Sequence, residues 1–385
     1  MILIKGAQIY TPENIGIQDV LICGETIAHI AKNIEPLFSE MKVIDGTGLI
    51  LTPGFIDQHV HVTGGGGEGG FATRVPEIML SALTKNGITT VVGLLGTDAS
   101  TRNVESLIAK VKGLKKEGLS AYAITGSYEL PTVTLTGSVK KDIIFIDEII
   151  GAKVALSDHR GSEPTCDEIA RLALEARVAG MISGKVGFLT IHVGNGKNGL
   201  QKLFEMVQDK EIPIKTLRPT HVNRRQELLN EAFEFARMGG LIDLTAGISR
   251  TASVAEIIVD ACKEGIPLEN ITISSDGGGS WSNYDNCGKL VEIGVSGVEG
   301  IFNEIVCLVK EKGFKLEDAL NFGTTNPAKA LGIFPQKGAI AEGSDADIIL
   351  MNNDLEIETV IANGKIHMQN REIIIKGTYE HLTGN

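Results

Sequence analysis

Six ionisable side chains fall on or at the ends of short apolar runs, and their residue types suit metal binding. His59 and His61 close the run FIDQHVH, where alternate strand residues share a face, so both imidazoles can point the same way. Any one histidine is more often a core or surface residue, but four of the eight occupy such places. Histidines with a carboxylate suit zinc or a similar divalent ion, and the predicted set is His59, His61, Lys153, His192, His221 and Asp276.

Lys153 is the unusual member of this set, because an ammonium group repels a metal ion. It lies inside the apolar run IGAKVAL, and a buried lysine tends to lose its proton. The neutral amine could add carbon dioxide, and the resulting carbamate could bridge two cations at ~3.5–4 Å separation. The alternative is a lysine that extends its amine to solvent or to an ion-pair partner, and the spacing alone leaves both interpretations open.

The runs that carry these residues belong to a repeating strand–helix pattern. Eight β-rich runs begin near residues 55, 89, 120, 150, 187, 215, 240 and 271, and amphipathic helices are predicted at 104–117, 165–179, 226–238 and 253–264. Glycines at 118, 180, 239 and 265 follow these helices, as C-capping favours. Eight such units predict a (β/α)8 TIM barrel, whose sites lie at the C-terminal ends of the strands. A Rossmann fold is disfavoured because Gly64–Gly67 lacks the GxGxxG spacing.

Both chain ends are rich in short β-runs. Strands are predicted at 1–5, 18–23, 26–31 and 42–45, and again at 347–351, 359–362, 365–367 and 372–375, with Asn363-Gly364 as a hairpin turn. We therefore expect residues 1–50 and 335–385 to form a small β-sandwich domain, and residues 51–334 to form the barrel.

Composition excludes several classes of partner. The net charge is −12 and the chain has no Lys/Arg-rich run, which argues against nucleic acid. Five scattered cysteines without a CxxC pair argue against a disulfide framework and favour a reducing compartment. The N-terminal residues have no signal-peptide pattern, and no apolar run reaches the ~18–20 residues that span a bilayer. We expect a cytoplasmic protein without a membrane partner.

Longer motifs around these residues resemble the isoaspartyl (β-aspartyl) dipeptidases of the amidohydrolase superfamily. They are PGFIDQHVHVTGGGGEGG (53–70), VVGLLGTD (91–98), AKVALSDHR (152–160), RPTHVNR (218–224) and SSDGGGS (274–280). TTNPAKALGI (324–333) and KGAIAEGSDADII (337–349) are general signatures of the superfamily. The resemblance covers essentially the whole chain, and the GGGGE loop together with SDHR and THVNR is its most specific part.

The resemblance implies a site with two divalent metal ions, with zinc expected. His59, His61 and Asp276 would hold one ion, His192 and His221 the other, and a carboxylated Lys153 would bridge them. A hydroxide shared by the metals would attack the amide, with Asp276 as base and then acid. Tyr128 would stabilise the tetrahedral oxyanion.

The resemblance also implies how a substrate would bind. Glu68 would pair with a free α-amino group, assisted by Thr97, Ser280 and the backbone of the Gly64–Gly67 turn, including Gly66. Arg160 and Arg224 would bind a carboxylate through their planar forks. Residues 70–71, 162–163 and 281–284 border these loops without a clear match, and are candidates for shaping leaving-group preference.

The favoured hypothesis is thus a metallo-dipeptidase that cleaves the β-linked peptide bond of β-aspartyl dipeptides, and the resemblance suggests a homo-octamer. The alternatives are a dihydropyrimidinase-like cyclic amidase and an N-acyl amino-acid deacetylase, whose substrates carry no ammonium group for Glu68. A non-enzymatic scaffold on the same fold would have lost metal ligands, whereas all six are present.

Overall fold

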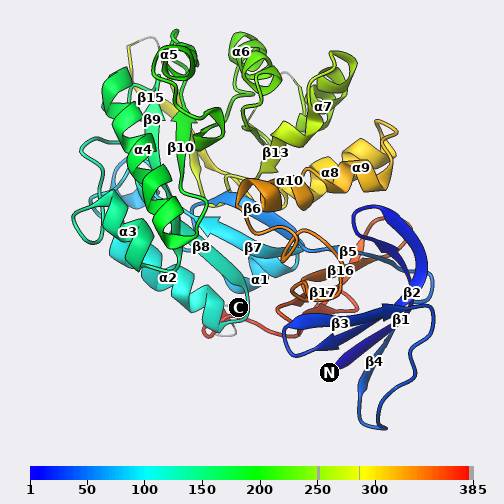
Figure 1. The fold of residues 1–385 in the computed structure, drawn as a ribbon. Coiled ribbons are helices and arrows are strands. Elements are labelled where there is room, and N and C mark those ends of the chain that lie inside the picture. The colour runs from blue at the N-terminus through cyan, green and yellow to red at the C-terminus, as the bar shows by residue number, and fades with distance from the viewer. Residues whose placement is uncertain (249–251, 286, 381–385) are drawn as a thin grey trace.

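A parallel barrel forms the centre of the molecule (Figure 1). The computed structural model describes residues 1–248, 252–285 and 287–380. Eight parallel strands follow one another in sequence order, and Val60 bridges to Gly277 so that the sheet nearly closes. The predicted barrel is confirmed, with strands β6 (Phe55–Val60), β7 (Ile88–Gly93), β8 (Ser120–Gly126), β9 (Ile149–Leu156), β10 (Phe188–Val193), β11 (Leu217–Thr220), β12 (Ile242–Thr245) and β13 (Ile271–Ser274).

Helices surround this barrel and bury apolar faces against its strands (Figure 1). The side chains of Thr165 and Ser253 cap α4 and α7, and in both capping boxes a glutamate three residues on completes the pair. The helices are α1 (Leu80–Thr84), α2 (Val104–Lys116), α3 (Val139–Phe145), α4 (Cys166–Ser183), α5 (Gln201–Asp209), α6 (Gln226–Arg237), α7 (Val254–Lys263), α8 (Gly300–Lys310), α9 (Leu316–Leu320) and α10 (Thr325–Ala330), and short 3-10 helices lie at Phe71–Thr73, Ile214–Thr216 and Leu268–Asn270.

The predicted end of α4 was wrong. The helix continues through Gly180 to Ser183, and Gly184 caps it in the left-handed conformation at φ 70°. Gly180 is needed for packing, because a Cβ there would lie 2.6 Å from the Cα of Gly187. By contrast, Gly118, Gly239 and Gly265 directly follow helix ends with positive φ, as expected.

Strands from both chain ends share one nine-stranded sheet beside the barrel (Figure 1). The two ends meet where β5 pairs antiparallel with β16, with Leu51 opposite Leu350. The predicted domain boundary at residue 50/51 falls within β5, residues 381–385 lie outside the described residues, and the division into domains stays a prediction. The strands are β1 (Ile2–Tyr10), β2 (Asn14–Cys23), β3 (Thr26–Ala31), β4 (Lys42–Asp45), β5 (Ile50–Pro53), β16 (Ile348–Met351), β17 (Ile357–Ala362), β18 (Lys365–Gln369) and β19 (Glu372–Ile373).

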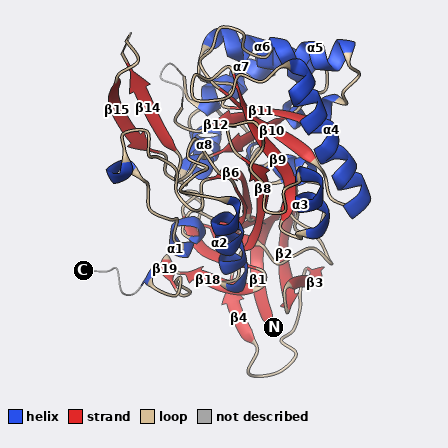
Figure 2. Ribbon diagram, turned by 90° about the vertical axis from the view of Figure 1, so that its left-hand side faces the viewer, coloured by secondary structure: helices blue, strands red, loops and turns tan. Residues whose placement is uncertain are grey.

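A separate hairpin, β14 (Ser280–Tyr284) with β15 (Leu290–Val295), follows the last barrel strand. Figure 2 shows it extending away from the barrel. Among the described residues, no helix is long and apolar enough to cross a membrane.

A buried ion-pair cluster ties the segment after α10 to the end sheet. The Lys337 amine lies 2.6 Å from carboxylate oxygens of both Asp345 and Asp347, and Lys337 is only 3% exposed. Asp347 also accepts from the amide of Asn363, whose side chain bonds to Ser120 on the barrel. Burial opposes the charge on Lys337, but the two carboxylates hold its pKa above the usual value. The amine is therefore a buried cation that joins the sheet to the barrel.

Replacing Lys337 by Met should lower the free energy of unfolding by about 3–5 kcal/mol, because Asp347 would remain buried without its partner. Urea unfolding followed by circular dichroism measures the change. Exposed Lys140, replaced by Met in the same way, should alter stability by no more than about 0.5 kcal/mol. A Lys337→Met protein as stable as the unmodified chain would contradict this role.

Candidate metal centre

The six predicted ligands come together at the C-terminal ends of the barrel strands. His59 lies on β6, Lys153 on β9 and His192 on β10. His61, His221 and Asp276 lie one or two residues beyond the ends of β6, β11 and β13. All six are buried, with exposed fractions between 0% for Lys153 and 8% for Asp276.

Asp276 lies at the centre of this cluster. Its Oδ1 is 3.2 Å from His61 Nε2 and 3.6 Å from His59 Nε2. Ligand atoms of His59, His221 and Asp276 all lie within 4.8 Å of one another, which is close enough for them to share one metal ion or to border two adjacent ions. The Lys153 amine is 3.4 Å from His59 Nε2 and so borders the same space.

His192 stands at the edge of the cluster. Its ring centroid is 4.6 Å from that of His221, but both of its nitrogens already have partners. The Tyr128 hydroxyl lies 2.8 Å from Nδ1, and an Asp158 carboxylate oxygen lies 2.9 Å from Nε2. Binding a metal through His192 would therefore replace one of these two contacts.

Burial sets the charge state of the cluster. It lowers the pKa of His59, His192 and His221 well below the usual value, and that of His61 less strongly. Burial also lowers the pKa of Lys153 to about 7. Neutral imidazoles and a readily deprotonated amine offer lone pairs, as metal ligands must.

Two buried atoms of the cluster have no hydrogen-bond partner among the described residues. They are His61 Nδ1 and Asp276 Oδ1. Buried polar atoms are normally satisfied, while the rings of His61 and His59 lie beside Asp276 Oδ1, at 3.2 and 3.6 Å. A carboxylate oxygen among neutral imidazoles is the pattern expected when a cation completes the site. The donor set thus fits a divalent metal of the zinc type.

Side chains behind the ligands fix their orientation. His221 Nδ1 lies 2.7 Å from the Thr245 hydroxyl, which leaves Nε2 to face the cluster. Asn223 exchanges two hydrogen bonds with the backbone of Thr245 and holds the loop after β11. His221 and Asp276 both adopt left-handed backbone, with φ of 62° and 54°. Such conformations are strained and persist where surrounding contacts fix them, as functional sites often do.

Asp57 is a buried acid that the sequence reasoning missed. It accepts from the amides of His59 at 3.2 Å and Ser275 at 3.3 Å, and also from the Ser275 hydroxyl. Burial raises its pKa to about 7. Asp57 shares the face of His59 and His61 by the same period of two, so the signal was present. Its contacts join the end of β6 to the segment that carries Asp276.

The loop that carries Glu68 lies beside most of the residues predicted to bind the α-amino group of a substrate. Ser280 Oγ donates to Glu68 at 2.8 and 3.0 Å, and Thr97 Oγ1 lies 3.5 Å from the same carboxylate. Gly66 has φ 85°, and a Cβ there would lie 2.3 Å from the Thr73 carbonyl, so this turn requires glycine. A cavity of about 380 Å³ is lined by Gly66, Glu68 and Thr97.

The two predicted arginines differ in their partners. Asp158, which the sequence reasoning did not assign, binds Arg160 at 3.0 and 2.8 Å, and Arg160 NH1 lies 3.4 Å from Glu68. Burial alone would raise the pKa of Asp158, but hydrogen bonds from His192 and Arg160 hold it well below the usual value. Arg224 Nε is buried with no hydrogen-bond partner among the described residues. The Arg224 guanidinium is therefore the freer of the two to receive a carboxylate.

Two of the segments without a clear match contact other loops. The rings of His159 and Tyr284 are 4.9 Å apart and nearly perpendicular, so the turn end of the β14–β15 hairpin contacts the loop after β9. His159 is exposed. The Ser162 hydroxyl accepts from the Leu130 amide at 2.8 Å and so tethers two loops near Tyr128.

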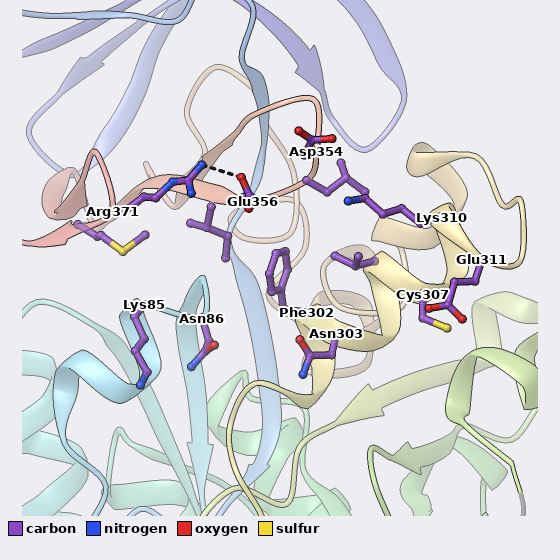
Figure 3. Close-up of a pocket in the computed structure, with 14 residues that line it drawn as sticks. Lys85, Asn86, Phe302, Asn303, Cys307, Lys310, Glu311, Asp354, Glu356 and Arg371 are labelled. Atoms are coloured by element: carbon purple, nitrogen blue, oxygen red, sulfur yellow. Dashed lines mark hydrogen bonds and ion pairs between the residues drawn. The ribbon is translucent and has the colours of Figure 1, made fainter.

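A larger cavity, of about 520 Å³, lies away from these residues (Figure 3). It is bounded by α8 and by the turns that precede β17 and β19. Arg371 at its edge is paired with Glu356 at 2.7 Å and with Glu358. The cavity contains none of the predicted ligands, so its size does not indicate the site of chemistry.

Comparisons with known proteins show the family and the fold to which the chain is similar. A family model described as "Amidohydrolase family" matches residues 50–367. A crystal structure of a β-aspartyl dipeptidase from Fervidobacterium islandicum AW-1, in complex with β-Asp-Leu dipeptide, is 45% identical, with a TM-score of 0.91 over 97% of this chain and 98% of that chain. A D-hydantoinase structure, 20% identical over 98% and 97% of the two chains, has a TM-score of 0.69 and shares the fold.

A dihydroorotase from Streptococcus pyogenes is 37% identical over 126 residues, which are 32% of this chain. The match spans only 28% of the length of that relative. It therefore concerns a segment of each chain and does not compare the two proteins as wholes.

Replacing Thr245 by Val should weaken metal binding about 10- to 100-fold, because His221 would lose the hydroxyl that fixes its ring. Competition with a chromophoric chelator measures the affinity. Thr89→Val is the matched control, since the Thr89 hydroxyl is also buried on a barrel strand but has no partner among the described residues. Equal affinities in the two variants would show that Thr245 does not orient a ligand.

Proposed function

The chain belongs to the amidohydrolase family, and we propose that it is a binuclear metal-dependent dipeptidase that hydrolyses β-aspartyl (isoaspartyl) dipeptides. The family is typically metal-dependent and the chain is a hydrolase. One observation carries the proposal. The hydrogen-bonded pair Glu68 and Ser280 lies beside a buried cluster of metal-ligand side chains, in the fold that this chain shares with the relative bound to β-Asp-Leu.

We assign His59, His61 and Asp276 to one metal ion and His192 and His221 to the other, with zinc as the expected metal. When bound, two such ions supply Lewis acidity to the scissile carbonyl and acidify a water molecule. The same donors also accept cobalt or manganese, so cellular supply would influence which metal is present.

Lys153 would act as the bridging ligand after carboxylation. Its amine lone pair attacks the carbon of CO2, an N–C bond forms, and one proton leaves to solvent, giving a carbamate anion. The lowered pKa supports this step, because burial favours the neutral amine that carries the attacking lone pair. The position also supports it, since the amine borders His59.

Asp276 is positioned to move the proton of the reaction. It would accept a proton from the attacking water and deliver it to the departing amine, which requires a carboxylate at the centre of the cluster. Tyr128 is suited to hydrogen-bond an oxyanion, because burial raises its pKa and keeps the hydroxyl protonated. The hydroxyl contacts His192, which is itself a member of the ligand cluster.

Charge complementarity would select the substrate. The free α-ammonium of a β-aspartyl dipeptide would pair with Glu68, held by Ser280 and Thr97. The carboxylate next to this ammonium group would pair with Arg224. The Nη1 of Arg160, which lies beside Glu68, would be nearby. Cyclic amides and N-acyl amino acids have no ammonium and would leave Glu68 without its partner, which disfavours these alternatives. The homo-oligomer suggested by the resemblance stays a prediction.

Lys153→Ala should lose metal and activity together. Metal affinity should be at least about 100-fold weaker, since removal of a ligand lowers metal affinity more than removal of a residue that orients a ligand. Short carboxylates such as formate or propionate should restore part of the activity by occupying the bridging position. Metal analysis and kinetics on one sample measure both effects, and Lys140→Ala serves as a control. Full activity without a carboxylate would refute the bridging role.

The substrate assignment predicts that kcat/KM for β-Asp-Leu exceeds that for α-Asp-Leu by about 10³-fold or more, because the α-linked peptide misplaces the charges that the site must satisfy. Glu68→Gln should lower kcat/KM for β-Asp-Leu about 10- to 100-fold and leave metal content unchanged. Exposed Glu175, changed to Gln, is the control.

Steady-state kinetics on both peptides and on dihydrouracil and an N-acetyl amino acid measure this preference. Hydrolysis of the α-linked peptide alone, or of a substrate without an ammonium group, would overturn the assignment. Parallel losses of metal and activity in Glu68→Gln would make Glu68 a structural residue.

A further inference from the structure

A further cavity, distinct from the two described above, lies at the opposite end of the barrel from the candidate metal centre. It occupies about 350 Å³ among the N-terminal ends of β10 to β13, and α10 forms one of its walls. Figure 1 shows α10 beside β6 and β13, which it contacts. In barrel enzymes the catalytic groups lie at the C-terminal ends, so this cavity is separate from the proposed hydrolytic site.

Arg218, the second residue of β11, lines this cavity as a buried cation without a counter-ion. It is 8% exposed, and its Nε and NH1 have no hydrogen-bond partner among the described residues. Its guanidinium lies 3.8 Å from the centroid of the Phe188 ring, which fixes the plane of the fork. Burial alone lowers the pKa of Arg218 to about 9, with no nearby charge acting on it.

Further basic residues surround the same space. Arg177, Lys215 and Lys329 line the cavity with Arg218, against a single acid, Glu269. None of the four cations forms an ion pair with a described residue, in a chain whose net charge is −12. Lys215 and Lys329 are exposed, so positive charge extends from the buried guanidinium of Arg218 to the surface.

The two asparagine side chains of the cavity already donate hydrogen bonds. The Asn326 amide donates to the carbonyls of Leu268 and Ile271 at 2.9 and 2.8 Å. The Asn270 amide donates to the Ala236 carbonyl at 3.0 Å. Arg218 is therefore the buried donor that remains available to a ligand.

We propose that this cavity is a binding site for a small oxyanion, a phosphate or a carboxylate, anchored by the guanidinium of Arg218. The planar guanidinium can donate to two oxygens of either group. An ionised acceptor supplies the negative counter-charge that the buried guanidinium lacks. The volume suits a small organic anion, and Lys215 and Lys329 would neutralise a second charge at the mouth. The proposal is independent of the hydrolytic activity.

Isothermal titration of the metal-loaded full-length protein tests the site, with inorganic phosphate in one arm and succinate in the other, and chloride at equal ionic strength as reference. We expect saturable binding of at least one oxyanion. Arg218→Met keeps an apolar contact with Phe188 and should weaken this binding at least about tenfold. Lys215→Gln with Lys329→Gln should weaken it less, while Lys140→Gln, which removes a distant exposed charge, should not change it.

Each result supports or overturns the site. Binding of phosphate alone, or of succinate alone, supports the site and identifies the group that it takes, and binding of both supports a general oxyanion site. No saturable binding to the unmodified protein overturns the proposal, because Arg218 would then be satisfied by water. Binding that persists in Arg218→Met, or that competes with β-Asp-Leu, places the anion at the metals and also overturns it. If Arg218→Met does not fold, the double lysine variant replaces it, and binding as tight as in the unmodified protein would then overturn the proposal.

Discussion

The exclusion of water from a cluster of nitrogen donors is the constraint on which the rest of the site depends. Four imidazoles and one amine lie together with Asp276 as the acid in their midst. Burial makes their protonated forms unfavourable, so the neutral forms with free lone pairs are favoured even where an acid lies beside an imidazole. A bound metal ion would then supply the positive charge that the unprotonated ligands lack.

Holding such a cluster requires strand ends that cannot move independently. The Asp57–Ser275 contact and the His61–Gly277 hydrogen bond close the barrel at the level of the ligands. The left-handed backbone at His221 and Asp276 turns both side chains inward, directly beyond their strands. The strain is local, while the contacts that fix it come from neighbouring strands, as with Thr245 behind His221.

The sequence was sufficient to predict the barrel, because eight strand–helix units leave few other folds. It was also sufficient to predict that the six ligands lie at one end of the barrel, since the C-terminal ends of parallel strands lie together. Asp158 and Thr245 were not assigned, because their roles depend on contacts between strands distant in sequence. Gly180 was misinterpreted for a related reason: local rules describe a cap, whereas its close approach to Gly187 is tertiary.

Two buried arginines show that this chain balances charge differently at the two ends of its barrel. Burial opposes the charge of Arg160, but Asp158 compensates and holds its pKa above the usual value. Arg218 is buried in the same barrel without an acid, and its pKa falls. A leucine or methionine would fill the Arg218 position with less desolvation, as buried ion pairs replaced by apolar groups show. The guanidinium beside Phe188 is therefore better explained by a ligand that binds it than by packing.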